Sequence, residues 1–502
     1  MAQMTLRREG GVPYKWLVAI AFVIGLFMDL LDTTIVNVAL PALGKHFHTN
    51  NTTLEWVITG YLLSLAVWIP ASGWLGDRFG TKRIYLFALA MFTIGSSLSG
   101  LAWNIDSLIA FRVLQGVGGG MMTPVGTAML FRAFPPEERA KASAVLTVPI
   151  AIAPTIGPIL GGWLVDSASW RWIFYINVPV GILALFFSFF VLREHTEEAP
   201  GRLDLTGLLL SGGGLPLALY AISRAPHAGW TSAEVLGTGL GGLALLALFI
   251  WHELRTTDPL LDLHLLNDRI FRVGNAAFFM TMIGLMGVLF LLPLYLQQLR
   301  GLSALDSGLT TFPEALGVVV ASGPVGKLYP KIGPRRLLAG GLLSTGVFTG
   351  LLALVGLETD LWWIRGVMFL VGLGLGFVFI PVQTAIYATI SSENTGRASA
   401  IFNTNRQVAS SIGVAIMATV LTSRTTNHVS GAVQAATAAT REATIRHGTL
   451  LGFHDTFLVA AIVTVVGGLI AFLIHDADAA ATMAQSQETS IAEPAAVPVA
   501  AD

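Results

Sequence analysis

Two acidic residues, Asp29 and Asp32, lie inside a long apolar run that begins near Trp16. The run is long enough to cross a bilayer, which takes about 20 residues. A charged side chain in hydrocarbon is costly, so such residues are rare there and usually face a cavity or a partner. The two acids are three residues apart and share one face of a helix. We therefore expect them either to pair with a base or to carry a proton.

Two more charged residues lie inside apolar runs. Arg112 lies a few residues into one run, with Gln115 one turn further on, and Glu314 directly follows Pro313 in another. Arg112 is placed for burial, although an arginine near a helix end can also snorkel to the interface. Glu314 is a functional candidate by its depth. Its alternative is a harmlessly hydrated acid where Pro313 loosens the helix.

The composition predicts an integral membrane protein. The 502 residues are 54% hydrophobic and only 12% charged, with a mean hydropathy of +0.70. Soluble domains carry about 25% charged residues. The net charge of -1 gives no argument for nucleic acid, and the absence of cysteine excludes disulfides and thiolate metal sites. No phosphate-binding loop is present, so we expect no nucleotide, cofactor or metal.

Apolar runs of spanning length recur along the chain, and fourteen can be counted. We therefore expect an all-α polytopic membrane protein with spans at 16–40, 54–75, 83–103, 107–130, 143–165, 172–192, 205–223, 234–251, 271–296, 306–327, 335–356, 361–390, 398–421 and 454–475.

The distribution of basic residues sets the expected orientation. Lys and Arg are about three times as frequent in the segments on the N-terminal side of the membrane as on the other side. This places both termini in the cytoplasm and predicts a multi-pass protein of the bacterial inner membrane. The longest loop, 422–453, would lie outside, and the tail 476–502 is rich in Ala, Glu and Gln and is expected to be disordered.

The chain contains an internal repeat. Gly80 and Gly333 are separated by 253 residues, and so are Arg83 and Arg336, and Arg112 and Arg365. Spans one to six therefore repeat as spans nine to fourteen, a pattern typical of transporters with a midplane site. The expected domains are a cytoplasmic N-terminus, a first six-helix bundle, a linker with two extra helices, a second six-helix bundle and the tail, at 1–15, 16–192, 193–270, 271–475 and 476–502.

Five short motifs follow one another in order: LDTTIVNVALP at 31–41, GWLGDRFGTKR at 73–83, RVLQGVG at 112–118, GPILGG at 157–162 and WRWIFYINVPVG at 170–181. Together they resemble the major facilitator superfamily, in particular its fourteen-span drug:proton antiporters, over residues 15–475. Two positions depart from the pattern: Ala153 replaces the first glycine of the fifth-span motif, and Pro330 replaces the loop acid in the second copy.

The resemblance implies proton-coupled efflux by alternating access, with a proton gradient as the energy source. Asp32 would carry the coupling proton, with help from Asp29 or Glu314, and Arg112 would control its release. Asp32 could instead be a structural acid held by nearby hydroxyls, and Asp29 could face a cationic substrate directly. If Arg112 paired permanently with Asp32, that acid would stay ionised, so the pairing must depend on the conformational state.

The remaining candidates gate the pathway or line it. The loop after span two is expected to latch the cytoplasmic side through Asp77 and its neighbours Gly73, Arg78, Gly80, Lys82 and Arg83. The antiporter motif Gly157, Pro158, Gly161 and Gly162 should bend span five, pack it closely and prevent a proton leak. We expect an apolar substrate site lined by Trp56, Tyr61, Phe402 and Asn403, together with Asp29 and Glu314.

The sequence thus predicts a non-enzymatic exporter of lipophilic, cationic drugs or toxic compounds that works as a monomer, with a periplasmic adaptor left open. Three other functions stay open. They are an exporter of one metabolite, lipid or siderophore, a proton symporter, and a receptor without transport activity. The fifth-span motif argues against the symporter, and the charged residues within the spans argue against the receptor.

Overall fold

The computed structural model describes residues 12–49, 51–197, 201–391, 393–435 and 441–483, and every regular element in this part of the chain is a helix. The N-half consists of α1 (Tyr14–Phe47), α2 (Asn51–Phe79), α3 (Thr81–Gly100), α4 (Ile105–Ala133), α5 (Arg139–Ser167), α6 (Trp172–Tyr175) and α7 (Asn177–Val191). The insert consists of α8 (Leu205–Ala228) and α9 (Ala233–Glu253).

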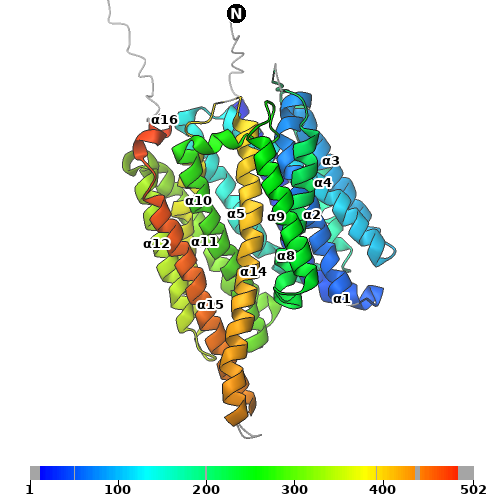
Figure 1. Ribbon diagram of the computed structural model, residues 1–502, viewed down its shortest axis with the longest axis vertical. Helices are drawn as coiled ribbons and strands as arrows, with labels where there is room; N and C mark the ends of the chain where they lie inside the picture. Colours follow the sequence, from blue (N-terminus) through cyan, green and yellow to red (C-terminus); the bar gives the residue numbers. More distant parts are fainter. Residues whose placement is uncertain (1–11, 50, 198–200, 392, 436–440, 484–502) are drawn as a thin grey trace, which may run out of the picture.

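The C-half repeats this order. It consists of α10 (Arg269–Leu294) with its π-helical extension η3 (Tyr295–Leu299), α11 (Ala304–Ile332), α12 (Pro334–Leu351), α13 (Leu361–Ile386), α14 (Thr395–Ala435) and α15 (Arg441–Ala471). Three short 3-10 helices connect long ones: η1 (Pro136–Glu138), η2 (Leu263–Asn267) and η4 (Leu352–Leu354). After α15 come the short η5 (Asp476–Ala479) and α16 (Ala480–Met483). The helices run side by side (Figure 1). We call the end where α1 begins and α15 ends the terminal face, and the other end the opposite face.

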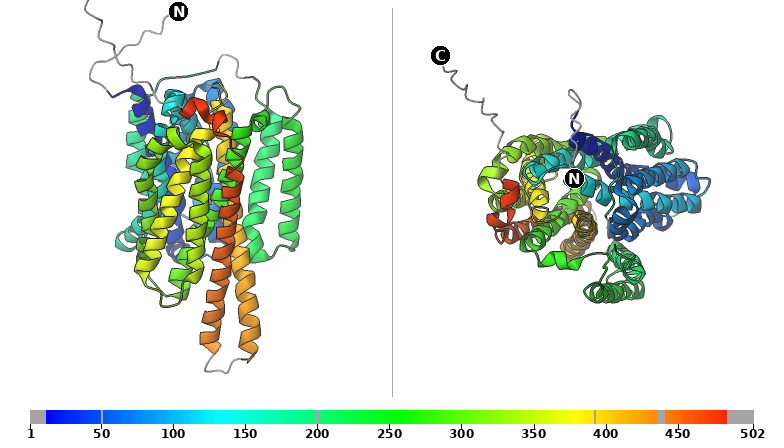
Figure 2. Two further views of the ribbon diagram at one scale, coloured as in Figure 1. Left: turned by 90° about the vertical axis from the view of Figure 1, so that its left-hand side faces the viewer. Right: turned by 90° about the horizontal axis from the view of Figure 1, so that it is seen from above.

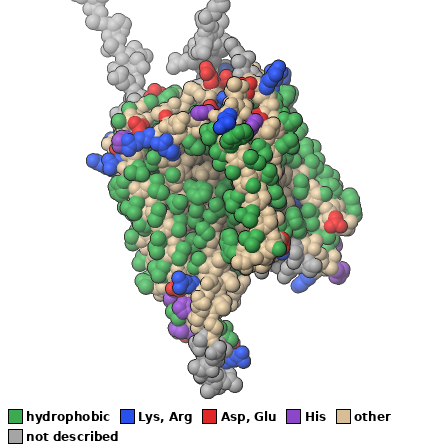
Figure 3. Space-filling view, in the orientation of Figure 1, with side chains coloured by type: hydrophobic (Ala, Val, Ile, Leu, Met, Phe, Trp, Pro, Cys, Tyr) green, Lys and Arg blue, Asp and Glu red, His purple; other side chains and the backbone are tan. Residues whose placement is uncertain are grey.

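Each of the fourteen expected spans falls on a helix, which confirms the all-α membrane architecture. Among the described residues, 11 helices are long and apolar enough to cross a membrane. Helices α4, α5 and α11 are not among them, so the count of fourteen spans stays a prediction. Two of these three helices, α4 and α11, carry the buried charges of Arg112 and Glu314. A helix that faces the interior of a bundle can carry such charges and needs less hydropathy than one that faces lipid. Figure 3 shows the apolar belt between two charged rims.

The insert packs at the seam between the two halves. Helix α8 contacts α9, α2 of the N-half and α14 of the C-half, and the pair stands beside the main bundle (Figure 2). Trp230, in the turn between α8 and α9, donates a hydrogen bond of 3.0 Å to the hydroxyl of Thr419 on α14. The insert therefore covers one side of the boundary along which the halves meet.

The repeat has the same local geometry in both copies. Gly80 and Gly333 separate α2 from α3 and α11 from α12, with φ of 100° and 83°. Beside each glycine lies an acid from the end of the same half, Glu194 or Asp476. Each carboxylate accepts the backbone N–H two residues after the glycine, at 3.0 Å and 2.9 Å. The acids thus cap the N-termini of α3 and α12, where the helix dipole favours negative charge.

The C-terminal helices extend further than hydropathy predicts. The sequence predicts a loop over 422–453, whereas α14 continues to Ala435 and α15 begins at Arg441, so that the two form a long hairpin beyond the opposite face (Figure 1). The sequence predicts disorder from residue 476 onward, whereas residues 476–483 form η5 and α16. Thr482 of α16 is buried and hydrogen-bonded to Tyr329 at 2.8 Å. Residues 1–11 and 484–502, which the sequence assigns to the termini, lie outside the described residues.

Glu138, in the turn between α4 and α5, should make a pH-dependent contribution to stability. A hydrogen bond from Lys15 holds the pKa of Glu138 below its usual range. A lowered pKa stabilises the folded state above the unfolded-state pKa of about 4.3, and the contribution is lost as pH falls through the folded-state value. We expect Glu138→Gln to lower stability at pH 7 by no more than about 1 kcal/mol, with the difference vanishing near pH 3. Thermal unfolding at both pH values measures it. The exposed neighbour Glu137→Gln is the control, and an equal effect of both substitutions would contradict the assignment.

Candidate functional site

Asp32 on α1 and Arg112 on α4 form a buried ion pair in the interior of the N-half. The Arg112 Nη1 atom lies 2.5 Å from Asp32 Oδ2, and the two residues are 1% and 0% exposed. Arg112 also donates through Nε to the backbone oxygen of Val57 at 3.2 Å. Its guanidinium lies 4.1 Å from the ring centroid of Tyr61. The arginine is therefore buried and does not snorkel to the interface.

Two amides complete the coordination of Asp32. Gln115 Nε2 donates to Asp32 Oδ1 at 2.9 Å, while Gln115 Oε1 accepts from Arg112 Nη1 at 2.8 Å. Asn177 Nδ2 on α7 donates to Asp32 Oδ1 at 3.2 Å and to Ser96 Oγ at 3.1 Å. All of these groups donate to the carboxylate, which suits an ionised acid because it accepts hydrogen bonds and cannot donate them.

The nearby threonines do not satisfy Asp32. Thr33 and Thr34 donate to backbone oxygens one turn earlier on α1, at 2.8 Å from Leu30 and 3.0 Å from Leu31 respectively. The sequence alternative in which these hydroxyls hold a structural acid therefore does not describe this conformation. A base and two amides hold it instead.

Asp29 belongs to a separate hydrogen-bond network. Its two oxygens accept from Tyr61 Oη at 2.6 Å and from Thr123 Oγ1 at 3.1 Å, and the residue is 5% exposed. Its side chain thus has neutral hydroxyl partners, whereas Asp32 has a charged one. The two acids share a helix face as expected, yet their partners differ in kind.

Glu314 on α11 is buried without a hydrogen-bond partner. It is 7% exposed, and its Oε2 atom has no partner among the described residues. The helix is pressed against α13, because a Cβ atom on Gly372 would lie 1.9 Å from the backbone oxygen of Glu314. Burying an unpaired carboxylate is expensive, so Glu314 is the least satisfied acid among these candidates.

The glycine-rich motif of α5 lies against α1 at Thr34 and Ile35, within one turn of Asp32. A Cβ atom on Gly157 would lie 2.1 Å from Thr34 Oγ1, and one on Gly161 would lie 2.8 Å from Ile35 Cγ1. These glycines let the backbones of α5 and α1 approach closely. Gly162 lies on the same helix, which runs uninterrupted from Arg139 to Ser167. The side chain of Pro158 lies outside the described residues.

The two halves meet at the terminal face. Ser399 on α14 donates to the backbone oxygen of Pro124 on α4 at 2.7 Å, and Thr384 on α13 donates to Ser143 on α5 at 3.0 Å. Arg139 donates to the backbone oxygen of Tyr387. We call this set of contacts the terminal gate, and it is closed in this conformation.

Gly73 and Asp77 bring the end of α2 to the start of α14. A Cβ atom on Gly73 would lie 3.1 Å from the backbone oxygen of Gly396, and one on Gly396 would lie 3.1 Å from Asp77 Oδ1. The Asp77 carboxylate therefore lies at the N-terminus of α14, where the helix dipole favours it. Its ion-pair partner is Arg132 of the same half, at 3.0 Å. Arg132, and not a base of the facing half, supplies this ion pair.

The basic residues of the same loop lie within the N-half. Lys82 Nζ donates to the backbone oxygen of Phe189 on α7 at 2.6 Å, and Arg83 lies 3.6 Å from Glu194. Arg78 is exposed. These bases thus position the loop on its own half, while Gly73 and Asp77 make the contact between halves.

The expected substrate-lining residues are only partly brought together. Tyr61 lies between Asp29 and Arg112, whereas Trp56 is 39% exposed and stacks on Tyr220 of the insert at 5.5 Å between ring centroids. Phe402 stacks on Phe278 at 4.6 Å. Asn403 directly follows Phe402 on α14, and its amide donates to the backbone oxygen of Ser399 at 2.9 Å. Trp56 therefore packs against the insert and not against the buried acids.

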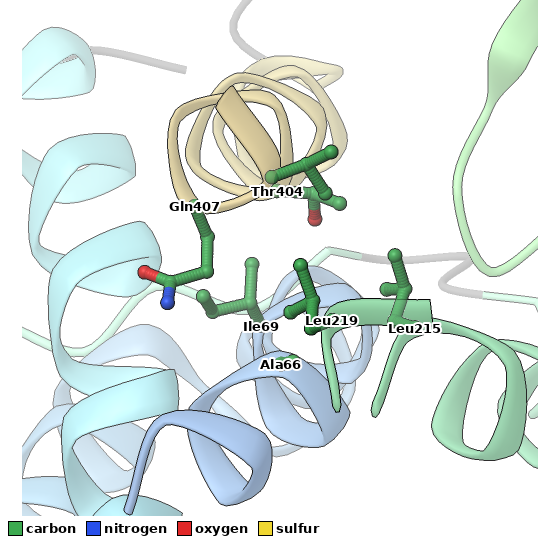
Figure 4. Close-up of a pocket in the computed structure, with 7 residues that line it drawn as sticks. Ala66, Ile69, Leu215, Leu219, Thr404 and Gln407 are labelled. Atoms are coloured by element: carbon green, nitrogen blue, oxygen red, sulfur yellow. The ribbon is translucent and has the colours of Figure 1, made fainter. Parts of the chain in front are cut away.

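A narrow apolar pocket lies beside this turn of α14. Its lining comes from α2, α8 and α14, and Figure 4 shows Thr404 and Gln407 extending toward Ile69, Leu215 and Leu219. Among the described residues, no group of His, Cys, Asp or Glu has the arrangement of a metal site.

Sequence reasoning missed several partners of the acids. Asn177, Ser96 and Thr123 hold the carboxylates, and Arg132 holds Asp77. Asn177 lies inside the fifth quoted motif, and a polar amide in an apolar run was the available signal. Ser96 and Thr123 gave no signal, because hydroxyls can bond to their own helix backbone and are common in spans.

The family model and the similar proteins indicate the same family. The family model of the Major Facilitator Superfamily matches residues 22–414. The Multidrug resistance protein B homolog of Mycobacterium tuberculosis is 37% identical over 404 residues, which cover 80% of this chain and 75% of that protein. The Putative multidrug resistance protein MdtD of Serratia proteamaculans is 32% identical over 414 residues, covering 82% and 86%.

A solved structure supports the same fold. The human organic anion transporter MFSD10 (TETRAN) superimposes with a TM-score of 0.64 at 15% identity, covering 92% of this chain and 100% of that one. At this identity the likeness concerns the fold alone.

Proposed function

The chain belongs to the Major Facilitator Superfamily, and from that premise we propose that it is a proton-coupled antiporter that exports lipophilic, cationic compounds. The relatives named as multidrug resistance proteins support drug efflux. The terminal face would be cytoplasmic and the membrane a bacterial inner membrane, in keeping with the basic residues of that face.

The observation that carries the proposal is the buried Asp32–Arg112 ion pair. A proton that reaches Asp32 removes its negative charge, so that Arg112 loses its counter-ion and a buried charge is left unpaired. That state is costly, and it is relieved when the helices rearrange. Protonation at one carboxylate is thereby converted into a change of packing within the N-half.

The closed terminal gate supplies the other half of the cycle. With the gate closed, Asp32 would exchange protons with the outside. The close glycine contacts between α5 and α1 would exclude water and oppose a leak. When the halves rock and the gate opens, Asp32 would release its proton inside and re-form the pair with Arg112. Substrate would bind between the halves near Asp29, Tyr61 and Glu314.

Purified protein in proteoliposomes tests the proposal, and reconstitution alone also tests whether an adaptor is needed. Protons should flow down an imposed pH gradient, and ethidium should move in the opposite direction, toward the acidic side. Collapsing the gradient with nigericin should slow dye movement about tenfold or more, since the gradient supplies the driving free energy. Dye movement that ignores the gradient would contradict proton coupling. Dye and protons moving in the same direction would indicate a symporter.

A further inference from the structure

Arg406 lies in the first third of α14, and its side chain makes no direct polar contact with the part of the chain that the structure describes. It is partly buried within a segment long and apolar enough to span the membrane. Its side chain forms no hydrogen bond, ion pair or ring contact with any described residue. An arginine at this depth is costly and is found facing a cavity or a partner. Five guanidinium N–H donors are therefore left for a ligand.

The charge facing Arg406 is Asp29 of the other half. The Asp29 carboxylate and the Arg406 guanidinium interact electrostatically, yet they form no ion pair. Asp29 accepts instead from the neutral hydroxyls of Tyr61 and Thr123. Each carboxylate oxygen has two lone pairs, so Asp29 can still bind a cation. Opposite charges on the two halves thus interact without a direct contact.

Buried aromatic rings lie near both charged groups. Phe402, one turn before Arg406 on the same helix, stacks on Phe278 of α10 at 4.6 Å between ring centroids. Tyr61 adds an aromatic ring on the Asp29 side. The apolar part of a molecule bound to both charged groups would therefore contact these aromatic rings.

We propose that Asp29 and Arg406 are the two poles of a site for lipophilic zwitterions. Asp29 binds the cationic group of the substrate, and Arg406 binds a carboxylate, for which its planar fork gives bidentate recognition. The bound substrate thereby connects Asp29 of the N-half to Arg406 of the C-half. This inference rests on the proposed export function and narrows its substrates from simple cations to molecules that also carry an acid.

Two dyes that differ in one group test the inference. Rhodamine 110 is a zwitterion with a free carboxylate, and rhodamine 123 is its cationic methyl ester. Fluorescence anisotropy would measure binding of each dye to the purified full chain and to Arg406→Gln, Arg406→Lys and the exposed control Arg424→Gln. We expect Arg406→Gln to weaken rhodamine 110 about tenfold, the size of a lost charge-assisted hydrogen bond, and to leave rhodamine 123 within about twofold. Arg406→Lys should restore part of the binding, and Arg424→Gln should change neither dye.

Each other outcome has a distinct meaning. Equal weakening of both dyes by Arg406→Gln, or no change in rhodamine 110, would overturn the role of Arg406 as the carboxylate pole. If the wild type binds rhodamine 123 and not rhodamine 110, the inference fails and the proposed export of cations stands. If it binds neither dye, the proposed function fails as well. Thermal unfolding of each variant separates lost binding from lost folding.

Discussion

Asp32→Asn should reduce proton-driven substrate exchange to the level of empty liposomes. Asparagine keeps the shape of the side chain and can still accept from Arg112, but it cannot take up and release a proton. The buried guanidinium is left without its counter-ion, and removing one partner of such a pair costs about 3–5 kcal/mol. We therefore expect both a loss of coupling and a lower unfolding temperature, measured by dye exchange and thermal unfolding of the same preparation.

A second substitution separates coupling from stability. In Asp32→Asn combined with Arg112→Gln, neither charge is buried, and we expect much of the lost stability to return because replacing both members of a buried pair is often near neutral. Exchange should stay absent. Asp106→Asn, at the exposed start of α4, is the matched control and should behave like the wild type. Wild-type exchange by Asp32→Asn would make Asp32 structural and move the search to Asp29 or Glu314.

The sequence could identify both members of the ion pair but not the pair itself. Asp32 and Arg112 stand out because charges inside apolar runs are rare. That they meet depends on the packing of α1 against α4, which no spacing along the chain reveals. The same holds for Asn177, which reaches Asp32 from α7. Periodicity and hydropathy predict helices, whereas the partners of a buried charge are set by how distant helices pack.

Hydropathy also explains why the C-terminal hairpin was not predicted. It marks where a chain crosses the hydrocarbon, and α14 continues for more than a turn beyond that point to Ala435. The segment 422–435 carries threonine, serine and asparagine side chains and is polar. A polar helix and a loop differ little in hydropathy, so the end of a span is not the end of its helix.

The loop after span two shows a similar limit. Its sequence predicts a contact between halves, and Gly73 and Asp77 do lie against Gly396. Lys82 contacts α7 instead, and the ion-pair partner of Asp77 is Arg132 on α4. The charges of a loop indicate that it binds something, but they do not choose between partners of the same half and the other half.

Gly73→Leu should hold the terminal gate open. A Cβ atom at this position already lies 3.1 Å from the backbone oxygen of Gly396, and the rest of a leucine side chain has no room between α2 and α14. The substitution is tolerated only when the halves separate at this face. A clash of about 2–3 kcal/mol is enough to bring a gate that is closed 99% of the time to equal populations. Export should fall about tenfold or more, because the cycle stalls in one state.

The internal repeat provides the matched control. Gly326 lies 253 residues after Gly73 at the equivalent position of α11, and a Cβ atom there would meet nothing within 4 Å. Gly326→Leu should therefore leave the gate unchanged. The chain has no cysteine, so a single Ala140→Cys, 5% exposed in the first turn of α5, reports opening through its rate of maleimide labelling. We expect Gly73→Leu to raise that rate about tenfold or more and Gly326→Leu to leave it unchanged. If labelling stays slow in Gly73→Leu while export is lost, the glycine contact is needed for the cycle without holding the gate. If labelling rises equally in both variants, the gate depends on general packing, and its dependence on the Gly73–Gly396 contact is refuted.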